Sequence, residues 1–444
     1  MSNGTIGAYP DVGPLKGLLD RIELYSQLKH EYGSALVQPA LRRLEREMRR
    51  ALARLRRLPP NVRLAEREPN GLAAIRALRP AGPRRIWREF NGREYARRLE
   101  GALLGRMAGC TLGAPVEGWP IERMEALARA NGERFPPTDY WSRAPALERD
   151  RKRYGVSPLA AYAREGMDGV PVDDDIVYTL IGLLIVERYG PDFTTADVGK
   201  AWLRYLPHAC TAERVALDNL KKGVAAARAA ALDNPYCEWI GADIRADPWA
   251  YVAPGWPERA AAMAYRDAYL SHRRQGIYGE MFFAAAISAA FAVEDPIEAI
   301  RIGLTEIPRH CALANAVRWA LRLAPRIRDY RQARAAVDSR FRGMSHLHTI
   351  NNACLTVWGL TIGGADFTKT IGQTVAMGLD NDCTAATAGS LLGAIVGRRG
   401  IPRRWYAPFH DTVRSYLVGL PRFSITDIER RFARQASRVH GRWR

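Results

Sequence analysis

The stretch Val172-Asp173-Asp174-Asp175-Ile176-Val177-Tyr178-Thr179 places three consecutive carboxylates directly before an apolar run, residues 180–186. The run is apolar on every helical face, which predicts a buried helix that begins at this acidic turn. Three adjacent negative charges repel one another unless a positive charge lies among them, and a helix N-terminus supplies only about half a charge. A bound divalent cation would supply the rest, because carboxylate oxygens are the ligands that Mg²⁺ and Mn²⁺ prefer.

A second acidic turn lies near the other end of the chain. Asp380 and Asp382 stand two residues apart and precede residues 385–394, which are mostly small and predict a helix that approaches its neighbours closely. The two turns together offer five carboxylates, which is enough for a two-metal site. The alternative is that each aspartate only caps its helix. The repetition of acidic turns before buried helices favours the metal site.

The totals describe a large globular chain with an unusual charge. Its 444 residues are 47% hydrophobic and 25% charged, which is ordinary for a folded protein that buries a large core. The formal net charge of +19 is not ordinary. A basic protein attracts anions, including phosphorylated ligands and nucleic acid, but the net charge does not distinguish between them.

The N-terminal part of the chain differs from the rest in its pattern of apolar and basic residues. Residues 15–58 are helical in pattern, with apolar residues at positions 41, 44, 48, 52 and 55 in one stripe and arginines on the other faces. The favoured interpretation is a solvated helix that packs on the main domain through its leucines. The alternative is an arm for an anionic partner such as nucleic acid. Pro59 and Pro60 end this helix. We therefore predict an Arg-rich helical extension and linker over residues 1–93, and a main domain over residues 94–444.

The main domain is predicted to be all-α. Helical patterns separated by Gly and Pro turns follow one another, and no strand-like alternation is sustained. The expected helices cover residues 94–109, 121–131, 176–189, 195–205, 211–231, 257–272, 279–293, 296–305, 309–324, 330–338, 346–361, 366–377 and 384–397.

The cysteines and the termini indicate a cytoplasmic protein. The six cysteines are scattered and form no CxxC pair, so we expect reduced thiols and neither a disulfide framework nor a zinc site. Residues 1–9 lack the basic and apolar regions of a signal peptide. No run of about eighteen apolar residues occurs, so no membrane partner is expected.

The stretch from Tyr95 to Glu117, YARRLEGALLGRMAGCTLGAPVE, together with the two acidic turns in this order, resembles the ADP-ribosylglycohydrolase family. The resemblance covers roughly residues 94–400 and rests on the ordered set of three elements. It implies a compact orthogonal helical bundle. It also implies two divalent ions, usually Mg²⁺ with Mn²⁺ as the alternative, held between the three elements.

The resemblance carries roles to individual residues. Glu117 matches the acid that contacts metal or polarises the attacking water, and Asp174 and Asp175 match the paired ligands, so these three are the expected catalytic residues. The expected metal ligands are Asp173, Asp174, Asp175, Asp380, Asp382 and Cys383. Three positions depart from the family pattern. Asp173 stands where a hydroxyl residue is usual. Cys383 stands where Thr or Ser is usual, and a thiol is a poor partner for Mg²⁺. Cys110 replaces an aspartate that supports the ligands.

The resemblance also indicates a substrate side. Residues 239–245 are similar to a glycine-rich loop whose backbone amides hold a diphosphate, which implies substrate contacts at Gly241 and Arg245. This loop is glycine-poor for the family. His272 matches a ligand-contacting histidine, although a lone histidine on an amphipathic helix is as often structural. Asn381, inside the second acidic turn, is the remaining expected substrate contact.

These assignments imply a divalent-metal-dependent hydrolase that cleaves a ribosyl C1–N or C1–O bond, with an ADP-ribosylated substrate as the first candidate. Three alternatives stay open. The first is a catalytically degenerate protein that binds ADP-ribose or a nucleotide. The second is a hydrolase of another riboside or ribosylated small molecule. The third is a nucleic-acid-associated protein that uses the Arg-rich helix.

Overall fold

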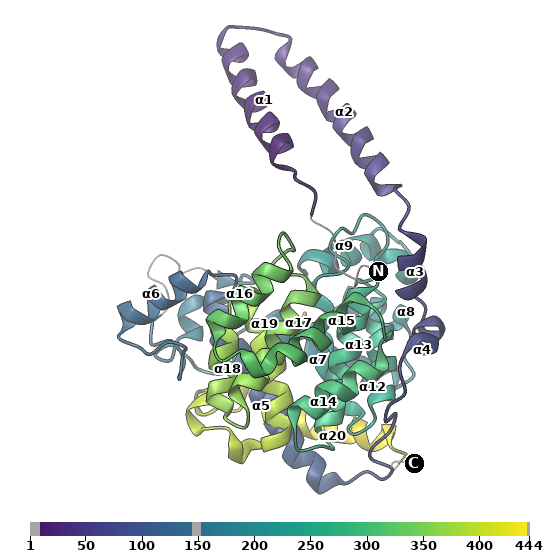
Figure 1. Ribbon diagram of the computed structural model, residues 1–444, viewed down its shortest axis with the longest axis vertical. Coiled ribbons are helices and arrows are strands. Elements are labelled where there is room, and N and C mark those ends of the chain that lie inside the picture. The colour runs from purple at the N-terminus through teal and green to yellow at the C-terminus, as the bar shows by residue number, and fades with distance from the viewer. Residues whose placement is uncertain (1–8, 144–151, 442–444) are drawn as a thin grey trace. The chain divides into compact units, whose positions relative to one another are not determined.

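The computed structural model describes residues 9–143 and 152–441, and these fall into two compact units, residues 9–67 and residues 68–441 (Figure 1). The predicted division after residue 93 stays a prediction about domains; residues 68–93 lie in the larger compact unit. Among the described residues, no helix combines the length and apolar character that crossing a membrane requires.

The smaller unit consists of helices α1 (Gly13–Glu31), α2 (Val37–Arg56) and α3 (Val62–Arg67). The sequence predicted continuous helix over residues 15–58, but the chain turns between α1 and α2. Gly33 lies there in the left-handed region with φ 73°, a conformation that ends helices. On α2, Leu52 and Leu55 are 46% and 64% exposed. The proposed anionic partner of this unit stays a prediction.

The larger unit is a bundle of helices, as the sequence predicted. Its α-helices are α4 (Leu72–Leu78), α5 (Gly92–Gly113), α6 (Ile121–Asn131), α7 (Asp174–Tyr189), α8 (Thr195–Tyr205), α9 (Thr211–Lys221), α10 (Ala226–Ala229), α11 (Asp247–Val252), α12 (Pro257–Ala268), α13 (Gln275–Ala290), α14 (Pro296–Gly303), α15 (Ala312–Leu323), α16 (Tyr330–Arg340), α17 (Thr349–Gly363), α18 (Phe367–Ala376), α19 (Asn381–Val396) and α20 (Ile425–Val439). Two short antiparallel strand pairs accompany them, β1 (Lys152–Arg153) with β2 (Ser157–Pro158), and β3 (Thr412–Arg414) with β4 (Arg422–Ser424).

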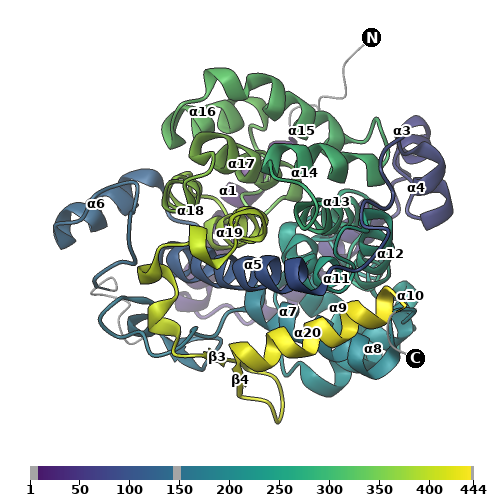
Figure 2. The same cartoon turned by 90° about the horizontal axis from the view of Figure 1, so that it is seen from below.

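Helix α20 is missing from the predicted helices. It begins at the N-cap Ser424, whose side chain accepts a hydrogen bond from the backbone of Asp427. Its apolar face, which includes Ile428 and Phe432, is buried against α5, α7 and α11, and Figure 2 shows its course beside them. The last helix predicted from the sequence covers residues 384–397, and α20 lies beyond it.

Helices α5 and α19 pack backbone to backbone. A Cβ added to Gly101, Gly105 or Gly109 would lie 2.1 Å from a carbonyl oxygen of α19, belonging to Gly393, Gly389 and Ala385 respectively. The glycines are four residues apart, so they share one face of α5. The small-residue face predicted for residues 385–394 is confirmed. This contact matters for the site, because α5 leads into Glu117 and α19 begins beside Asp380 (Figure 2).

The glycine contact makes a testable prediction. Gly105→Ala should destabilise the larger unit by about 3 kcal/mol, because the methyl group has no space and the two helix backbones must separate. Urea denaturation followed by circular dichroism measures the change. Gly17→Ala is the control, since Gly17 lies inside α1 with nothing within 4 Å of its added Cβ. It should leave the larger unit unchanged and raise the stability of the smaller unit by less than about 1 kcal/mol. Equal effects of the two substitutions would contradict the close packing.

Helix α7 begins at the first acidic turn, as the sequence predicted. Asp173 is its N-cap, and its Oδ1 accepts a hydrogen bond from the backbone N–H of Asp175 at 3.1 Å. The helix is buried along most of its length, and a Cβ on Gly182 would lie 2.4 Å from Pro248. Asp173 therefore caps α7 through Oδ1, and its second carboxylate oxygen is left for other partners.

Candidate functional site

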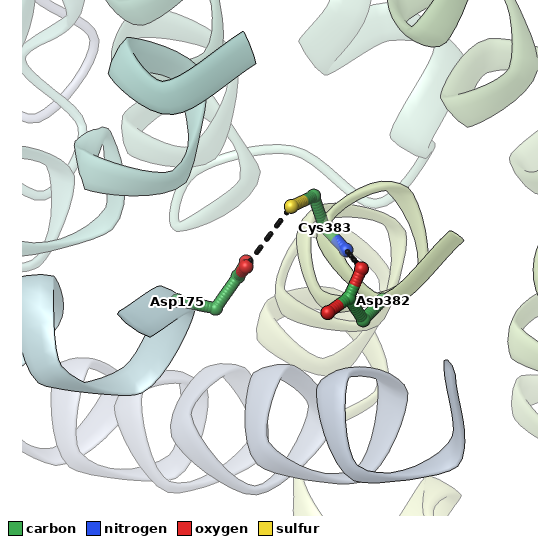
Figure 3. Close-up of side chains that lie close together, drawn as sticks. All are labelled: Asp175, Asp382 and Cys383. Carbon is green, nitrogen blue, oxygen red and sulfur yellow. Dashed lines mark hydrogen bonds between the residues drawn. The ribbon is translucent and has the colours of Figure 1, made fainter. Parts of the chain in front are cut away.

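The two acidic turns converge at one point of the bundle, where the chain also passes after α5. Three groups of side chains each have ligand atoms within 4.8 Å of one another: Asp173, Asp174 and Asp175; Glu117, Asp380 and Asp382; and Asp175, Asp382 and Cys383. Figure 3 shows the last group, with Asp175 on α7 facing Cys383 on α19. The structure thus brings together every residue predicted to be catalytic or to bind metal. Their roles stay predictions.

The carboxylates of this acidic centre are mostly buried. Asp173, Asp175, Asp380 and Asp382 are at most 3% exposed. Burial raises the pKa of Asp173, Asp175 and Asp380, and the neighbouring Asp382 raises each of them further. Burial, followed by the nearby Glu117, raises the pKa of Asp382 to about 6. Burial therefore disfavours the ionised form of these carboxylates, and a bound cation would stabilise that form.

Asp380 gives a more local indication. Its Oδ1 atom is buried and has no hydrogen-bond partner among the described residues. Buried carboxylate oxygens are normally satisfied, because an unpaired one costs free energy. An unpaired buried oxygen at the N-terminus of α19 indicates a position where a cation or a water molecule can bind.

Arg106 binds the acidic centre but was not predicted from the sequence. It lies on α5 and is 1% exposed. Its Nη2 donates to Asp175 Oδ1 at 3.1 Å and to the carbonyl oxygen of Ile244 at 2.5 Å, and its Nη1 donates to Asp247 Oδ2 at 2.7 Å. Arg106 therefore orients the Asp175 carboxylate and links helices α5, α7 and α11 through these hydrogen bonds. A lone arginine within the apolar stretch of residues 101–113 was the signal that could have revealed it.

Arg153, which lies on strand β1, is a further arginine that binds the acidic centre. Its Nη1 donates to Glu117 Oε2 at 2.7 Å, and its Nη2 donates to Asp173 Oδ2 at 2.7 Å and to Asp382 Oδ2 at 3.1 Å. The guanidinium therefore touches a carboxylate from each of the three predicted elements. No pattern in the sequence singles out this arginine.

The hairpin that carries Arg153 is tied to the first acidic turn. Tyr154 donates its hydroxyl to Asp174 Oδ1 at 2.6 Å. Ser157 Oγ accepts a hydrogen bond from the backbone N–H of Val172 at 3.1 Å. Between β1 and β2, Tyr154 and Gly155 both have positive φ angles, as a tight hairpin turn requires. These contacts hold β1 beside Asp173 and Asp174.

The two cysteines that depart from the family pattern are both buried. Cys383 donates its S–H to Asp175 Oδ2 at 3.0 Å (Figure 3). Burial, followed by the charge of Asp175, raises the pKa of Cys383 well above its ordinary value, so the thiol stays protonated. The thiolate is the form that binds metal, so Cys383 would have to lose this proton to serve as a ligand. Cys110 is likewise buried in α5 with a raised pKa. All six cysteines are free.

A cavity of about 360 Å³ opens beside the acidic centre, which is within the range of small-molecule sites. Its lining consists of Glu117, Lys152, Arg153, Tyr154, Asp174, Cys210, Thr211, Glu213, Trp239, Ile240, Gly241, Ile244, Leu347, Asp380, Asp382 and Cys383. Glu117, Asp174, Asp380, Asp382 and Cys383 thus share one cavity with Gly241, the predicted contact for a diphosphate, while Asp173 and Asp175 lie behind this lining.

Glu213 adds a further carboxylate to the cavity lining. A Cβ on Gly241 would lie 2.2 Å from Glu213 Oε1, so the glycine allows this carboxylate to approach the backbone closely. Glu213 accepts a hydrogen bond from Arg245 Nη1 at 2.7 Å. Burial raises the pKa of Glu213 to about 7, and Arg245 opposes that rise. Glu213 was not selected from the sequence, because no motif marks it.

Three predicted substrate contacts do not line the cavity. Arg245 is 1% exposed, and besides Glu213 it binds Asp267 and Glu280 at 2.5 and 3.3 Å. His272 is fully buried with Nδ1 2.8 Å from Ser271 Oγ, and burial lowers its pKa well below the ordinary value. The side chain of Asn381 donates to the carbonyl oxygen of Val375 at 3.0 Å. The structure gives these three side chains internal partners.

The residues present fit a divalent cation by their donor chemistry. Oxygen donors from carboxylates surround the centre, one of them is unpaired, and the soft donor Cys383 is engaged with Asp175. Hard cations such as Mg²⁺ and Mn²⁺ prefer such a set. Arg153 opposes this fit most, because it bonds to three of the carboxylates, whereas Arg106 bonds to Asp175 alone among them.

The helical bundle and its paired acidic turns define an all-α protein with a carboxylate-rich binding cavity. A sequence model of the ADP-ribosylglycohydrolase family matches residues 91–438. The chain belongs to the ADP-ribosylglycohydrolase family, whose name describes glycosidase-type hydrolases, and the resemblance seen in the sequence is confirmed. 

Comparison with solved structures supports the fold. A structure named "ADP-ribosylglycohydrolase-related protein complex" superposes with a TM-score of 0.50 and is 20% identical, covering 78% of this chain and 99% of its own. At that identity the likeness concerns the fold alone. No curated protein sequence matches the chain.

Proposed function

We propose that this chain is a divalent-metal-dependent hydrolase that cleaves a ribosyl glycosidic bond, with an ADP-ribosylated substrate as the first candidate. The observation that carries the proposal is the convergence of six carboxylates, from two helix N-termini and from Glu117, in one cluster, four of which line the cavity. Family membership supports glycosidase chemistry in general. The dependence on metal and the ribosyl substrate are the additions that this proposal makes.

The chemistry follows from the residues of the acidic centre. Asp173, Asp174, Asp175, Asp380 and Asp382 would hold the metal, and Mg²⁺ or Mn²⁺ suits their oxygens. A bound divalent ion orients the ribose hydroxyls and lowers the pKa of water.

Glu117 is the proposed general base. It lies on the cavity wall and is more exposed than the buried aspartates, so a water molecule can reach it. Asp174, half-buried and bound to the Tyr154 hydroxyl, would position the sugar. The transition state of such a reaction is oxocarbenium-like, and the surrounding carboxylates stabilise its positive charge.

The experiment that tests the proposal is calorimetric titration of ADP-ribose with and without Mg²⁺, together with hydrolysis assays on ADP-ribosylated and simple ribosides. Hydrolysis that stops on chelation and returns with Mg²⁺ is expected. Tight binding of ADP-ribose with no turnover of any riboside would instead indicate a degenerate binding protein. Hydrolysis that is insensitive to chelation would contradict the proposed metal dependence.

A riboside without a diphosphate is the second candidate substrate, and Glu213 favours it. The carboxylate of Glu213 lies against Gly241, at the loop where the family resemblance implies a diphosphate. A carboxylate repels phosphate oxygens and accepts hydrogen bonds from hydroxyl or amino groups. Its partner Arg245 does not cancel this charge fully, because Arg245 also binds Asp267 and Glu280.

Glu213 therefore predicts a pH dependence of ligand binding. Its pKa is about 7, so the carboxyl is mostly neutral at pH 6 and mostly charged at pH 8. The wild-type protein should bind ADP-ribose more weakly at pH 8 than at pH 6, and Glu213→Gln should bind it roughly tenfold more tightly at pH 8, which corresponds to about 1.4 kcal/mol. Calorimetry at both pH values measures this. Glu122→Gln, at an exposed position on α6, is the control and should leave affinity unchanged. An unchanged affinity in Glu213→Gln would remove Glu213 as a determinant.

A further inference from the structure

The acidic centre already contains a positive charge supplied by the chain itself. Arg153 bonds to Glu117, Asp173 and Asp382, and so connects both acidic turns and the segment that follows α5. These three carboxylates belong to three different elements of the fold, separated by up to 229 residues from Arg153. Arg153 therefore lies at the meeting point of the predicted metal ligands.

The arrangement differs from that of a surface ion pair. The Arg153 side chain is only 13% exposed, and its Nη1 also donates to the carbonyl oxygen of Ala114 at 2.8 Å. Both terminal nitrogens thus bond to more than one acceptor. Arginine has a planar fork of donors that suits several carboxylates at once. The anchors of its hairpin, Tyr154 and Ser157, keep β1 against the first acidic turn.

A guanidinium and a divalent ion compete for the same carboxylate oxygens. Asp173 Oδ2, Asp382 Oδ2 and Glu117 Oε2 already accept hydrogen bonds from Arg153, and a cation placed among them would also be repelled by the guanidinium charge. Oxygens outside this set remain. Asp380 Oδ1 is buried and has no partner among the described residues, which independently points to a cation at the α19 side of the centre.

We propose that the Arg153 guanidinium stands in the place of one divalent ion, so that this chain binds a single divalent ion and not the pair that the family resemblance implies. The inference rests on the proposed function only in requiring that a divalent ion binds at all. Arg153 then serves as a permanent charge partner for Asp173 and Glu117, and the single ion uses the carboxylate oxygens that Arg153 leaves free.

The test counts Mn²⁺ ions bound to the full-length protein, by equilibrium dialysis with elemental analysis and by electron paramagnetic resonance. The wild-type chain should bind about one Mn²⁺ and give the spectrum of an isolated ion. Arg153→Gln removes the charge and should bind about two, with the spectrum of a coupled pair. Lys152→Gln is the matched control, since Lys152 is the adjacent lysine on the same cavity wall, and it should still bind one ion.

Each outcome decides the matter. Two ions in the wild-type protein would overturn the inference without any variant, so it can be refuted even if Arg153→Gln does not fold. One ion in both the wild-type and a folded Arg153→Gln would also overturn it. Two ions with metal-dependent hydrolysis would leave the proposed function standing. One ion without hydrolysis of any riboside would keep the inference and refute the function. No bound ion would contradict both.

Discussion

The Asp380→Asn/Asp382→Asn double variant is expected to lose hydrolysis of a ribosyl substrate by roughly a thousand-fold or more, while its metal-free form becomes more stable than the wild type. Loss of the metal removes several kcal/mol of transition-state stabilisation, and about 4 kcal/mol corresponds to a thousand-fold. Both aspartates line the cavity at the start of α19 and belong to the same cluster with Glu117. Asparagine keeps their size and removes the charges that a cation requires.

The gain in stability follows from the raised pKa values. Asp382 has a pKa near 6 in the folded protein against 3.8 as its ordinary value, so the folded state binds more protons than the unfolded state between these two pH values. Stability of the metal-free protein is therefore lost as the pH rises through about 4 to 6, and the full cost of roughly 3 kcal/mol is present above pH 6. The double variant avoids this cost, as an asparagine does not titrate.

Measurement requires the unfolding free energy from urea titrations at pH 4 and pH 7.5 in the presence of a chelator. The double variant should match the wild type most closely at pH 4 and exceed it at pH 7.5, and addition of Mg²⁺ should stabilise only the wild type. Asp218→Asn, at an exposed position on α9, should behave as wild type throughout. A double variant that is less stable than the wild type at pH 7.5 would show that these carboxylates serve the fold and not a cation.

The parts of this site that the sequence predicts are those encoded by neighbouring residues. The acidic turns could be recognised because aspartates at short spacing precede apolar runs that bury themselves, and the structure places Asp175 and Asp382 together as that pattern indicated. The small residues at 385–394 likewise indicated a close helix contact, which the packing of Gly105 against Gly389 bears out. Local sequence patterns were thus enough to predict the class of fold and the carboxylates of the acidic centre.

The charges that balance the carboxylates could not be predicted in this way. Arg106 and Arg153 lie 69 and 229 residues from the carboxylates Asp175 and Asp382 that they bind. Arg106 stands out only as a lone charge in an apolar stretch, which does not identify its partners, and nothing distinguishes Arg153 among 66 basic residues. Arg245 illustrates the converse. A motif suggested that it faces the ligand, but its three carboxylate partners come from α9, α12 and α13, and only the folded chain reveals that they enclose it.

Arg106→Met is expected to destabilise the larger unit by about 4 kcal/mol, because removing one partner from a buried ion-pair network leaves the other charges unpaired. Arg106 is enclosed by Asp175, Asp247 and backbone carbonyls, and Met has a similar length without a charge. Arg97→Met on the same helix is the control, since Arg97 is 43% exposed and its pair with Glu94 should contribute less than about 1 kcal/mol. Equal losses in the two variants would contradict the assigned network.

The two partners of Arg106 separate its effect on the fold from its effect on the site. Asp247 lies away from the cavity lining and accepts further hydrogen bonds from Tyr251 and Ser390, so adding Asp247→Asn to Arg106→Met should recover part of the lost stability. Asp175 would still lack the donor that orients it, so affinity for Mn²⁺ should stay at least about tenfold weaker in the double variant. Full recovery of both stability and metal affinity would show that Arg106 acts only through Asp247 and does not position Asp175.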